Sequence, residues 1–215
     1  MFTRIAENVY SFLWNDYRQN NCNTYLIDAD RRVLIDPGHV QLFGHVEQGL
    51  ARLGLSRGDV DLVLATHGHP DHLEGVKLFE GKSLFALSQA EYRFVSGGNR
   101  YAAQLPLPDF FLASGSFKFG NLRFEIIETP GHSPGGICIY WPFMKALFPG
   151  DLVFSQGVGR ADLPGGDPEE LKESLRRVRN LDVAYLLCGH GNVVSGKDKV
   201  RSNFRLIEEH YVRAL

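Results

Sequence analysis

The sequence predicts an α/β protein in which two β-sheets pack face to face and helices cover both outer faces, a four-layer αββα sandwich. Strand-like segments precede helix-like segments twice: strands over residues 9–35, helices over 42–54 and 71–94, strands over 117–150, and helices over 168–180 and 198–213. Each β-rich half has to bury one face of its sheet, and packing the two sheets together buries both. Because the chain has no repeat, low-complexity tract or linker, we expect residues 1–215 to form a single domain.

The first half alternates strand-like and helix-like segments. Two apolar runs, 25–27 and 33–35, flank the polar segment 28–32, which predicts a β-hairpin. Apolar residues at helical spacing predict a helix over 42–54 that ends at Gly54. The other expected elements are a strand over 9–14, a short buried strand within 59–67, and a short helix that follows Ser88 as its N-cap.

The second half begins with residues 97–116, which carry prolines, glycines, serines and aromatic residues and therefore predict a long loop. Asp167 as N-cap and Pro168 at the first helical position predict the helix over 168–180. The remaining expected elements are three strands over 117–131, 135–142 and 145–151, a further strand over 183–191, and a last helix over 196–215.

Composition and charge argue against nucleic-acid and membrane partners. The formal net charge is −2, and the 23 lysines and arginines are spread without a run, whereas a nucleic-acid partner usually requires a basic patch. No apolar window reaches the roughly 18 residues of a spanning helix, and the N-terminus lacks the uninterrupted apolar region of a signal peptide. The chain has an odd number of cysteines, three, and they are widely spaced: Cys22, Cys138 and Cys188. This pattern indicates reduced thiols and a cytoplasmic location.

Histidines and aspartates cluster directly after strand-like runs in four places: "VLATHGHPDH", "IIETPGHSPGG", "ALFPGDLVF" and "YLLCGHG". Loops at strand ends commonly converge on one binding site. Neutral imidazoles and carboxylates are ligands preferred by zinc and accepted by iron and manganese. We therefore expect a metal site built from His67, His69, Asp71, His72, His132, Asp151 and His190.

The spacing within residues 67–72 suggests two ions. In an extended segment, residues i and i+2 point to the same side, so His67 and His69 can contact one ion. Pro70 turns the chain, and Asp71 and His72 then face a second ion.

On these segments, together with "LIDPG" upstream, the chain resembles the metallo-β-lactamase superfamily over its whole length. Within that superfamily, it is most similar to the glyoxalase II-like hydrolases. The stretch "GVGRADLPGGDPEELKESLRRV" resembles both those hydrolases and the persulfide dioxygenases. The resemblance implies the metallo-β-lactamase fold and two ions per chain, expected to be Zn²⁺, with Fe²⁺ or Mn²⁺ as alternatives. By this resemblance, His67, His69 and His132 hold the first ion, Asp71, His72 and His190 the second, and Asp151 bridges both.

The implied activity is hydrolysis of small thioesters or related esters, with a hydroxide held between the ions as nucleophile and Asp71 orienting it. Two cations lower the pKa of a shared water and polarise the substrate carbonyl. Asp36 is either an acceptor for a ligand imidazole or a turn-forming residue before Pro37. The alternatives are a mononuclear iron persulfide dioxygenase that uses His67, His132 and Asp151, a lactone hydrolase, and a non-catalytic metal-binding module.

We expect the partner to be a small-molecule substrate that contacts loops, because the basic C-terminal region of longer glyoxalase II enzymes has no match here. Tyr101 and Arg160 are the candidate substrate-binding residues, with Trp14 and Tyr17 as further aromatic candidates. Arg160 has two interpretations: it binds a substrate carboxylate through both guanidinium prongs, or it forms an ion pair with Asp162 or Asp167 that braces the loop. The sequence does not indicate an oligomeric state.

Overall fold

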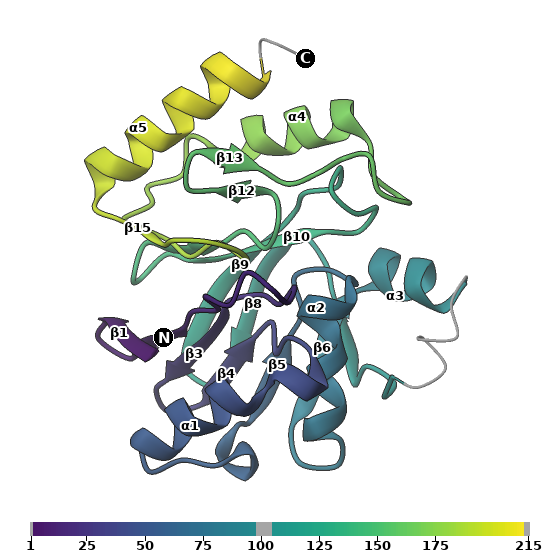
Figure 1. Cartoon of the computed structure of the whole chain (residues 1–215), viewed down its shortest axis with the longest axis vertical. Helices are drawn as coiled ribbons and strands as arrows, with labels where there is room; N and C mark the ends of the chain where they lie inside the picture. Colours follow the sequence, from purple (N-terminus) through teal and green to yellow (C-terminus); the bar gives the residue numbers. More distant parts are fainter. Residues whose placement is uncertain (1, 98–104, 213–215) are drawn as a thin grey trace.

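Two β-sheets pack face to face, and helices cover both outer faces, which confirms the predicted four-layer sandwich (Figure 1). The computed structural model describes residues 2–97 and 105–212. Helices α4 (Pro168–Val178) and α5 (Lys197–Ile207) lie at one end of the molecule in this view, and α1 (Gly44–Arg52) lies at the other. The other helices are α2 (Pro70–Leu73) and α3 (Gln89–Ser96), with 3₁₀ turns at Val40–Leu42, Arg57–Asp59 and Glu74–Phe79 and a π-helical turn at Glu208–Val212.

The first sheet joins an antiparallel half to a parallel half. Its strands, in spatial order, are β1 (Phe2–Ala6), β2 (Val9–Phe12), β3 (Thr24–Asp28), β4 (Arg32–Ile35), β5 (Leu62–Leu64), β6 (Leu84–Ser88) and β7 (Phe110–Leu112). Strands β1 to β4 pair antiparallel, and β4 to β7 pair parallel. Because parallel strands all end at the same edge, the segments after β4 and β5 emerge side by side.

The second sheet is antiparallel except at one pair. Its spatial order is β15 (Val194–Ser195), β14 (Tyr185–Leu186), β11 (Ala146–Phe148), β10 (Ile137–Trp141), β9 (Leu122–Glu128) and β8 (Gly115–Phe119), and the exception is the parallel pair β11–β14. Strands β12 (Val153–Phe154) and β13 (Gly157–Val158) form a separate two-stranded ribbon. Within the described residues, no helix is long and apolar enough to cross a membrane.

Side-chain alternation along the strands builds three apolar layers. In β3, Tyr25 and Ile27 point into the layer between the sheets, whereas Leu26 points out to the layer beneath α1. In β10, Ile139 joins the inter-sheet layer and Tyr140 joins the layer beneath α4 and α5. A strand whose two faces are both covered must be apolar on both, which explains why the central strands are continuous apolar runs.

The predicted hairpin is present as β3 and β4, and Asp167 caps α4 by accepting hydrogen bonds from the backbone N–H groups of Glu169 and Glu170. Ser88 caps α3 in the same way, through Glu91 N–H. The three cysteines are free, in agreement with the predicted reduced thiols, and all three are buried. The prediction that residues 1–215 form one domain stays a prediction.

Three predictions of secondary structure were wrong. The helical segment over 71–94 is interrupted by β6, a buried parallel strand whose short apolar run has no periodicity to distinguish it from a helix. The predicted loop over 97–116 contains β7, an edge strand that pairs parallel with β6. The single strand expected over 117–131 is a hairpin of β8 and β9 that turns at Gly120, where φ is +59°.

Replacement of Phe124 by Ala tests the inter-sheet layer. This side chain is fully buried, so its removal leaves a cavity that should lower the free energy of unfolding by about 3–5 kcal/mol. Phe143→Ala is the matched control, since Phe143 is 84 % exposed and its loss should change the same free energy by less than about 0.5 kcal/mol. Equal effects in denaturant titrations would show that the inter-sheet layer does not carry the stability of the fold.

Candidate metal centre

The loops at one edge of the two sheets bring all seven predicted ligand residues together. His67 and His69 follow β5, Asp71 and His72 lie on α2, His132 follows β9, Asp151 follows β11, and His190 follows β14. They form three overlapping groups whose ligand atoms lie within 4.8 Å of one another: His67, His69 and His132; His67, His72 and Asp151; and Asp71, His72 and His190.

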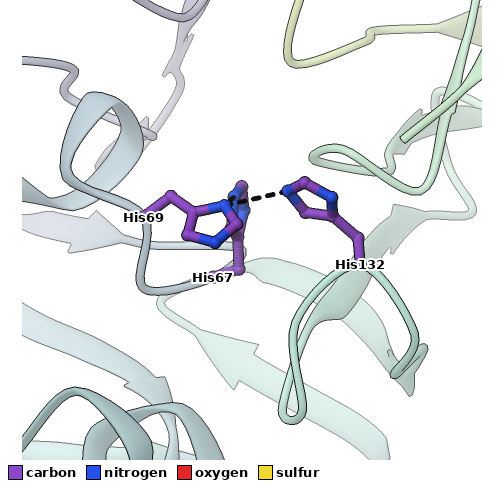
Figure 2. Close-up of side chains that lie close together, drawn as sticks. All are labelled: His67, His69 and His132. Atoms are coloured by element: carbon purple, nitrogen blue, oxygen red, sulfur yellow. Dashed lines mark hydrogen bonds between the residues drawn. The ribbon is translucent and has the colours of Figure 1, made fainter. Parts of the chain in front are cut away.

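The first group consists of three imidazoles that face one another (Figure 2). His69 Nδ1 lies 3.1 Å from His67 Nε2 and 2.9 Å from His132 Nε2. A tetrahedral zinc ion with Zn–N bonds of about 2.0–2.1 Å separates its ligand nitrogens by about 3.3 Å. The spacing of the three nitrogens is therefore close to that of a bound ion.

We refer to Asp71, His72 and His190 as the second group, which combines two imidazoles with a carboxylate. His72 Nε2 and His190 Nε2 are 3.2 Å apart. Asp71 Oδ2 lies 3.3 Å from His190 Nε2 and 4.0 Å from His72 Nε2. Asp71 and His72 project from the short helix α2, which begins at Pro70 directly after His69. The helix thus places Asp71 and His72 beside His190, while His72 also stays close to His67.

Asp151 lies between the two groups. Its Oδ1 is 3.2 Å from His72 Nε2, and its Oδ2 is 3.2 Å from His190 Nε2 and 3.5 Å from His132 Nε2. One carboxylate therefore reaches an imidazole of each group.

The buried carboxylate of Asp36 orients two of the imidazoles. His72 donates from Nδ1 to Asp36 Oδ2 at 2.9 Å, and Thr66 donates to Asp36 from its backbone N–H and from Oγ1, each at 2.8 Å. His67 Nδ1 in turn lies 3.1 Å from Thr66 Oγ1. A neutral imidazole that donates a hydrogen bond from Nδ1–H presents its Nε2 lone pair to the centre. This observation supports the first of the two interpretations of Asp36.

His132 is oriented by a backbone carbonyl. Its Nδ1 donates to the carbonyl oxygen of Arg160 at 2.6 Å. The Arg160 guanidinium itself points elsewhere and pairs through two hydrogen bonds, of 2.9 and 2.8 Å, with Asp162. Both side chains of that pair are mostly exposed. The ion pair of the bracing interpretation is thus present, while substrate binding by Arg160 stays a prediction.

One buried carboxylate oxygen of the centre lacks a hydrogen-bond donor, which favours a bound cation. Asp151 Oδ1 is buried and has no hydrogen-bond partner among the described residues, although His72 Nε2 is only 3.2 Å away. In a neutral His72 that donates from Nδ1–H to Asp36, this contact joins the Nε2 lone pair to a carboxylate oxygen. Two acceptors facing each other in a buried site are unfavourable unless a proton or a metal ion lies between them. The donor set therefore fits divalent cations.

The two groups differ in electrostatic character. Burial, and then the neighbouring imidazoles His132 and His72, lower the pKa of His69 to about 4, and burial also lowers the pKa of His67, so these two imidazoles of the first group are neutral. Burial also lowers the pKa of His190, but its hydrogen bonds with Asp151 and Asp71 outweigh burial and raise the pKa to about 9. The field of the two carboxylates thus favours positive charge at the second group.

The sequence analysis missed Asn20, whose side-chain N–H donates to Asp71 Oδ2 at 2.8 Å. Asn20 lies in the polar segment before β3, and no local pattern links it to a residue 51 positions away. A hollow of about 240 Å³ opens beside His190 and is lined by the same segment, including Trp14, Tyr17 and Asn20. The predicted substrate residue Tyr101 lies outside the described residues.

Comparisons with known proteins agree on the family. The sequence profile of the metallo-beta-lactamase superfamily matches residues 17–190. A probable metallo-hydrolase of Methanocaldococcus jannaschii is 33 % identical over 80 % of this chain and 88 % of its own length. The hydroxyacylglutathione hydrolase GloC of Haemophilus influenzae is 31 % identical over 86 % of this chain and 92 % of its own length.

Solved structures share the fold. A metallo-beta-lactamase family protein of Thermus thermophilus superposes with a TM-score of 0.82 at 22 % identity, covering 96 % of this chain and 80 % of its own. The protein TTHA1623, solved in a di-iron-bound form, superposes with a TM-score of 0.71 at 30 % identity, covering 90 % of this chain and 95 % of its own. With its two-sheet fold and its histidine-rich edge, this chain belongs to the metallo-β-lactamase superfamily, a superfamily of metal-dependent hydrolases.

Proposed function

We propose that this chain is a hydrolase that holds two divalent cations and cleaves small thioesters or related esters. The observation that carries the proposal is the position of Asp151, whose two oxygens lie near His72 and His132, one from each group. In this proposal the first ion is held by His67, His69 and His132, the second by Asp71, His72 and His190, and Asp151 contacts both.

Two such cations, when bound, lower the pKa of a shared water toward neutrality and polarise a substrate carbonyl. The chain's own part is to hold the ligands in fixed directions. Asp71 has two roles in the proposal, since one carboxylate can contact the second ion and also orient the attacking water. Asn20 supports this role because its amide N–H donates to Asp71 Oδ2 and fixes the carboxylate.

The substrate class rests on the relatives and on the hollow beside His190. The relative named hydroxyacylglutathione hydrolase matches 86 % of this chain, which supports a thioester of a small hydroxy acid. The hollow, which holds about 240 Å³, is lined by Asn20, whose exposed side-chain amide can hydrogen-bond with the polar atoms of such a substrate. We propose zinc as the metal, because imidazole-rich sites suit it, and iron as the alternative, because a relative has been solved in a di-iron-bound form.

Metal content tests the two-ion proposal. Protein purified without added metal should contain close to two ions per chain. His190→Ala should lose about one of them, since it removes an imidazole from the second group and leaves the three-histidine group intact. Its hydrolysis rate at neutral pH should fall at least about tenfold, equivalent to about 1.4 kcal/mol of barrier. The matched control His210→Ala removes an exposed histidine and should keep both ions. A His190→Ala variant with full metal content and full rate would show that His190 is no ligand.

Oxygen dependence tests the reaction class. Hydrolysis needs only water, so turnover of S-lactoylglutathione or a simple thioester should proceed at the same rate with and without oxygen. Oxygen consumption on addition of glutathione persulfide, with no thioester turnover and one iron per chain, would replace the hydrolase proposal by the dioxygenase alternative.

A pair of variants tests Arg160 as a substrate contact. If its guanidinium binds a substrate carboxylate, Arg160→Lys should raise KM by about tenfold with little change in kcat, because an ammonium replaces a two-pronged donor. Asp162→Asn should lower KM, since it releases the guanidinium from its present partner. If both variants leave KM unchanged and lower the melting temperature, Arg160 only braces the loop.

A further inference from the structure

A buried carboxylate that belongs to neither metal group lies at the start of α3. Glu91 is only 1 % exposed. Because a buried glutamate is rare unless it is paired, its hydrogen-bond partners need to be identified. Both of its oxygens accept backbone hydrogen bonds: Oε2 from Gly68 N–H and Oε1 from Gly135 N–H, each at 2.8 Å. The carboxylate therefore connects two segments that are 67 residues apart in the chain.

These two segments carry the three histidines of the first group. Gly68 lies between His67 and His69, and Gly135 lies three residues after His132. The first segment leaves β5 in the seven-stranded sheet, and the second leaves β9 in the six-stranded sheet. The three-histidine group is thus assembled across the two sheets, and Glu91 hydrogen-bonds to the loop from each sheet.

The fit around Glu91 is close. A Cβ atom on Gly68 would lie 2.6 Å from Glu91 Oε2, and a Cβ atom on Gly135 would lie 2.4 Å from Glu91 N. Both distances are shorter than real Cβ contacts, so both loops need glycine to approach the helix. Ser88, the N-cap of α3, adds a further link by donating from Oγ to the carbonyl oxygen of Gly135.

The chemistry of the link requires a carboxylate. An ionised glutamate offers two acceptor oxygens, one for each glycine N–H. A glutamine offers one acceptor and one donor, so its NH₂ group would face a backbone N–H, and one of the two loops would lose its partner. The shape of the side chain would stay the same, which makes Glu91→Gln a specific test of the hydrogen bonds.

From this geometry we infer that Glu91 is a positioning residue that holds the His67–His69 loop and the His132 loop in register before metal binds. The inference rests on the proposed metal site and adds a residue that touches neither metal nor substrate. Replacing residues that orient metal ligands typically lowers metal affinity by about 10- to 100-fold. The second group depends on α2, Asp151 and His190. Helix α2 continues from the His67–His69 loop, but its His72 is held separately by the Asp36 carboxylate. The effect should therefore fall on one ion of the two.

The test measures the affinity of each ion by competition with a chelator, using Zn²⁺ and the complete chain. Glu91→Gln should weaken one ion by about 10- to 100-fold and change the other much less. In the His190→Ala background, where the three-histidine group alone is complete, Glu91→Gln should weaken the remaining ion by the same factor. Asp109→Asn is the matched control: it also exchanges a carboxylate for an amide, but at the other end of β6, where Asp109 accepts a single backbone N–H, that of Phe85.

Equal metal affinities in wild type, Glu91→Gln and Asp109→Asn would overturn the inference. Amide hydrogen exchange of the metal-free wild type gives a second measurement that needs no variant. Gly68 and Gly135 should exchange slowly, because Glu91 holds their N–H groups without metal. Exchange of both glycines at the rate of a free loop would also overturn it. A wild type that binds no metal would instead overturn the proposed function, and the exchange rates would still test the role of Glu91.

Discussion

The buried carboxylate of Asp36 joins the end of β4 to the two segments that carry His67 and His72. It accepts hydrogen bonds from the Thr66 backbone N–H, from Thr66 Oγ1 and from His72 Nδ1, at 2.8, 2.8 and 2.9 Å. The residue is 2 % exposed, and its backbone has a φ of +53°, a left-handed conformation that is uncommon outside glycine and is adopted by asparagine, aspartate and histidine more often than by other residues. The backbone around Asp36 is held in turn by Thr24 Oγ1, which donates to its carbonyl oxygen at 2.7 Å. The directions of two candidate ligands therefore depend on one turn.

The packing of the two sheets then sets the distance between the two halves of the centre. His67, His69, Asp71 and His72 come from the seven-stranded sheet, and His132, Asp151 and His190 come from the six-stranded sheet. Backbone and side-chain links cross between the sheets close to the centre. Ile137 N–H donates to Thr66 O at 2.9 Å, Asn23 N–H donates to Gly189 O at 2.7 Å, and Tyr25 OH donates to Cys188 O at 2.6 Å. The packing of the inter-sheet core therefore fixes the distances between the ligand residues, because a change in sheet spacing would separate those of one sheet from those of the other.

The part of this arrangement that the sequence predicted is the part that is local. Histidine and aspartate directly after apolar strands signalled the edge where loops meet. Residues whose partners lie far along the chain gave no such signal. Glu91 looks like an ordinary residue in the first turn of a helix, and only the fold brings it to Gly68 and Gly135. Strand β6 was missed for a related reason, since a short strand buried on both faces has no periodicity of its own.

The most direct measurement of the central claim is a crystal structure of the metal-loaded protein with anomalous diffraction at the absorption edge of the bound metal. Two peaks are expected, one enclosed by His67, His69 and His132 and the other by Asp71, His72 and His190, with Asp151 reaching both. A single peak, or peaks away from these residues, would contradict the account.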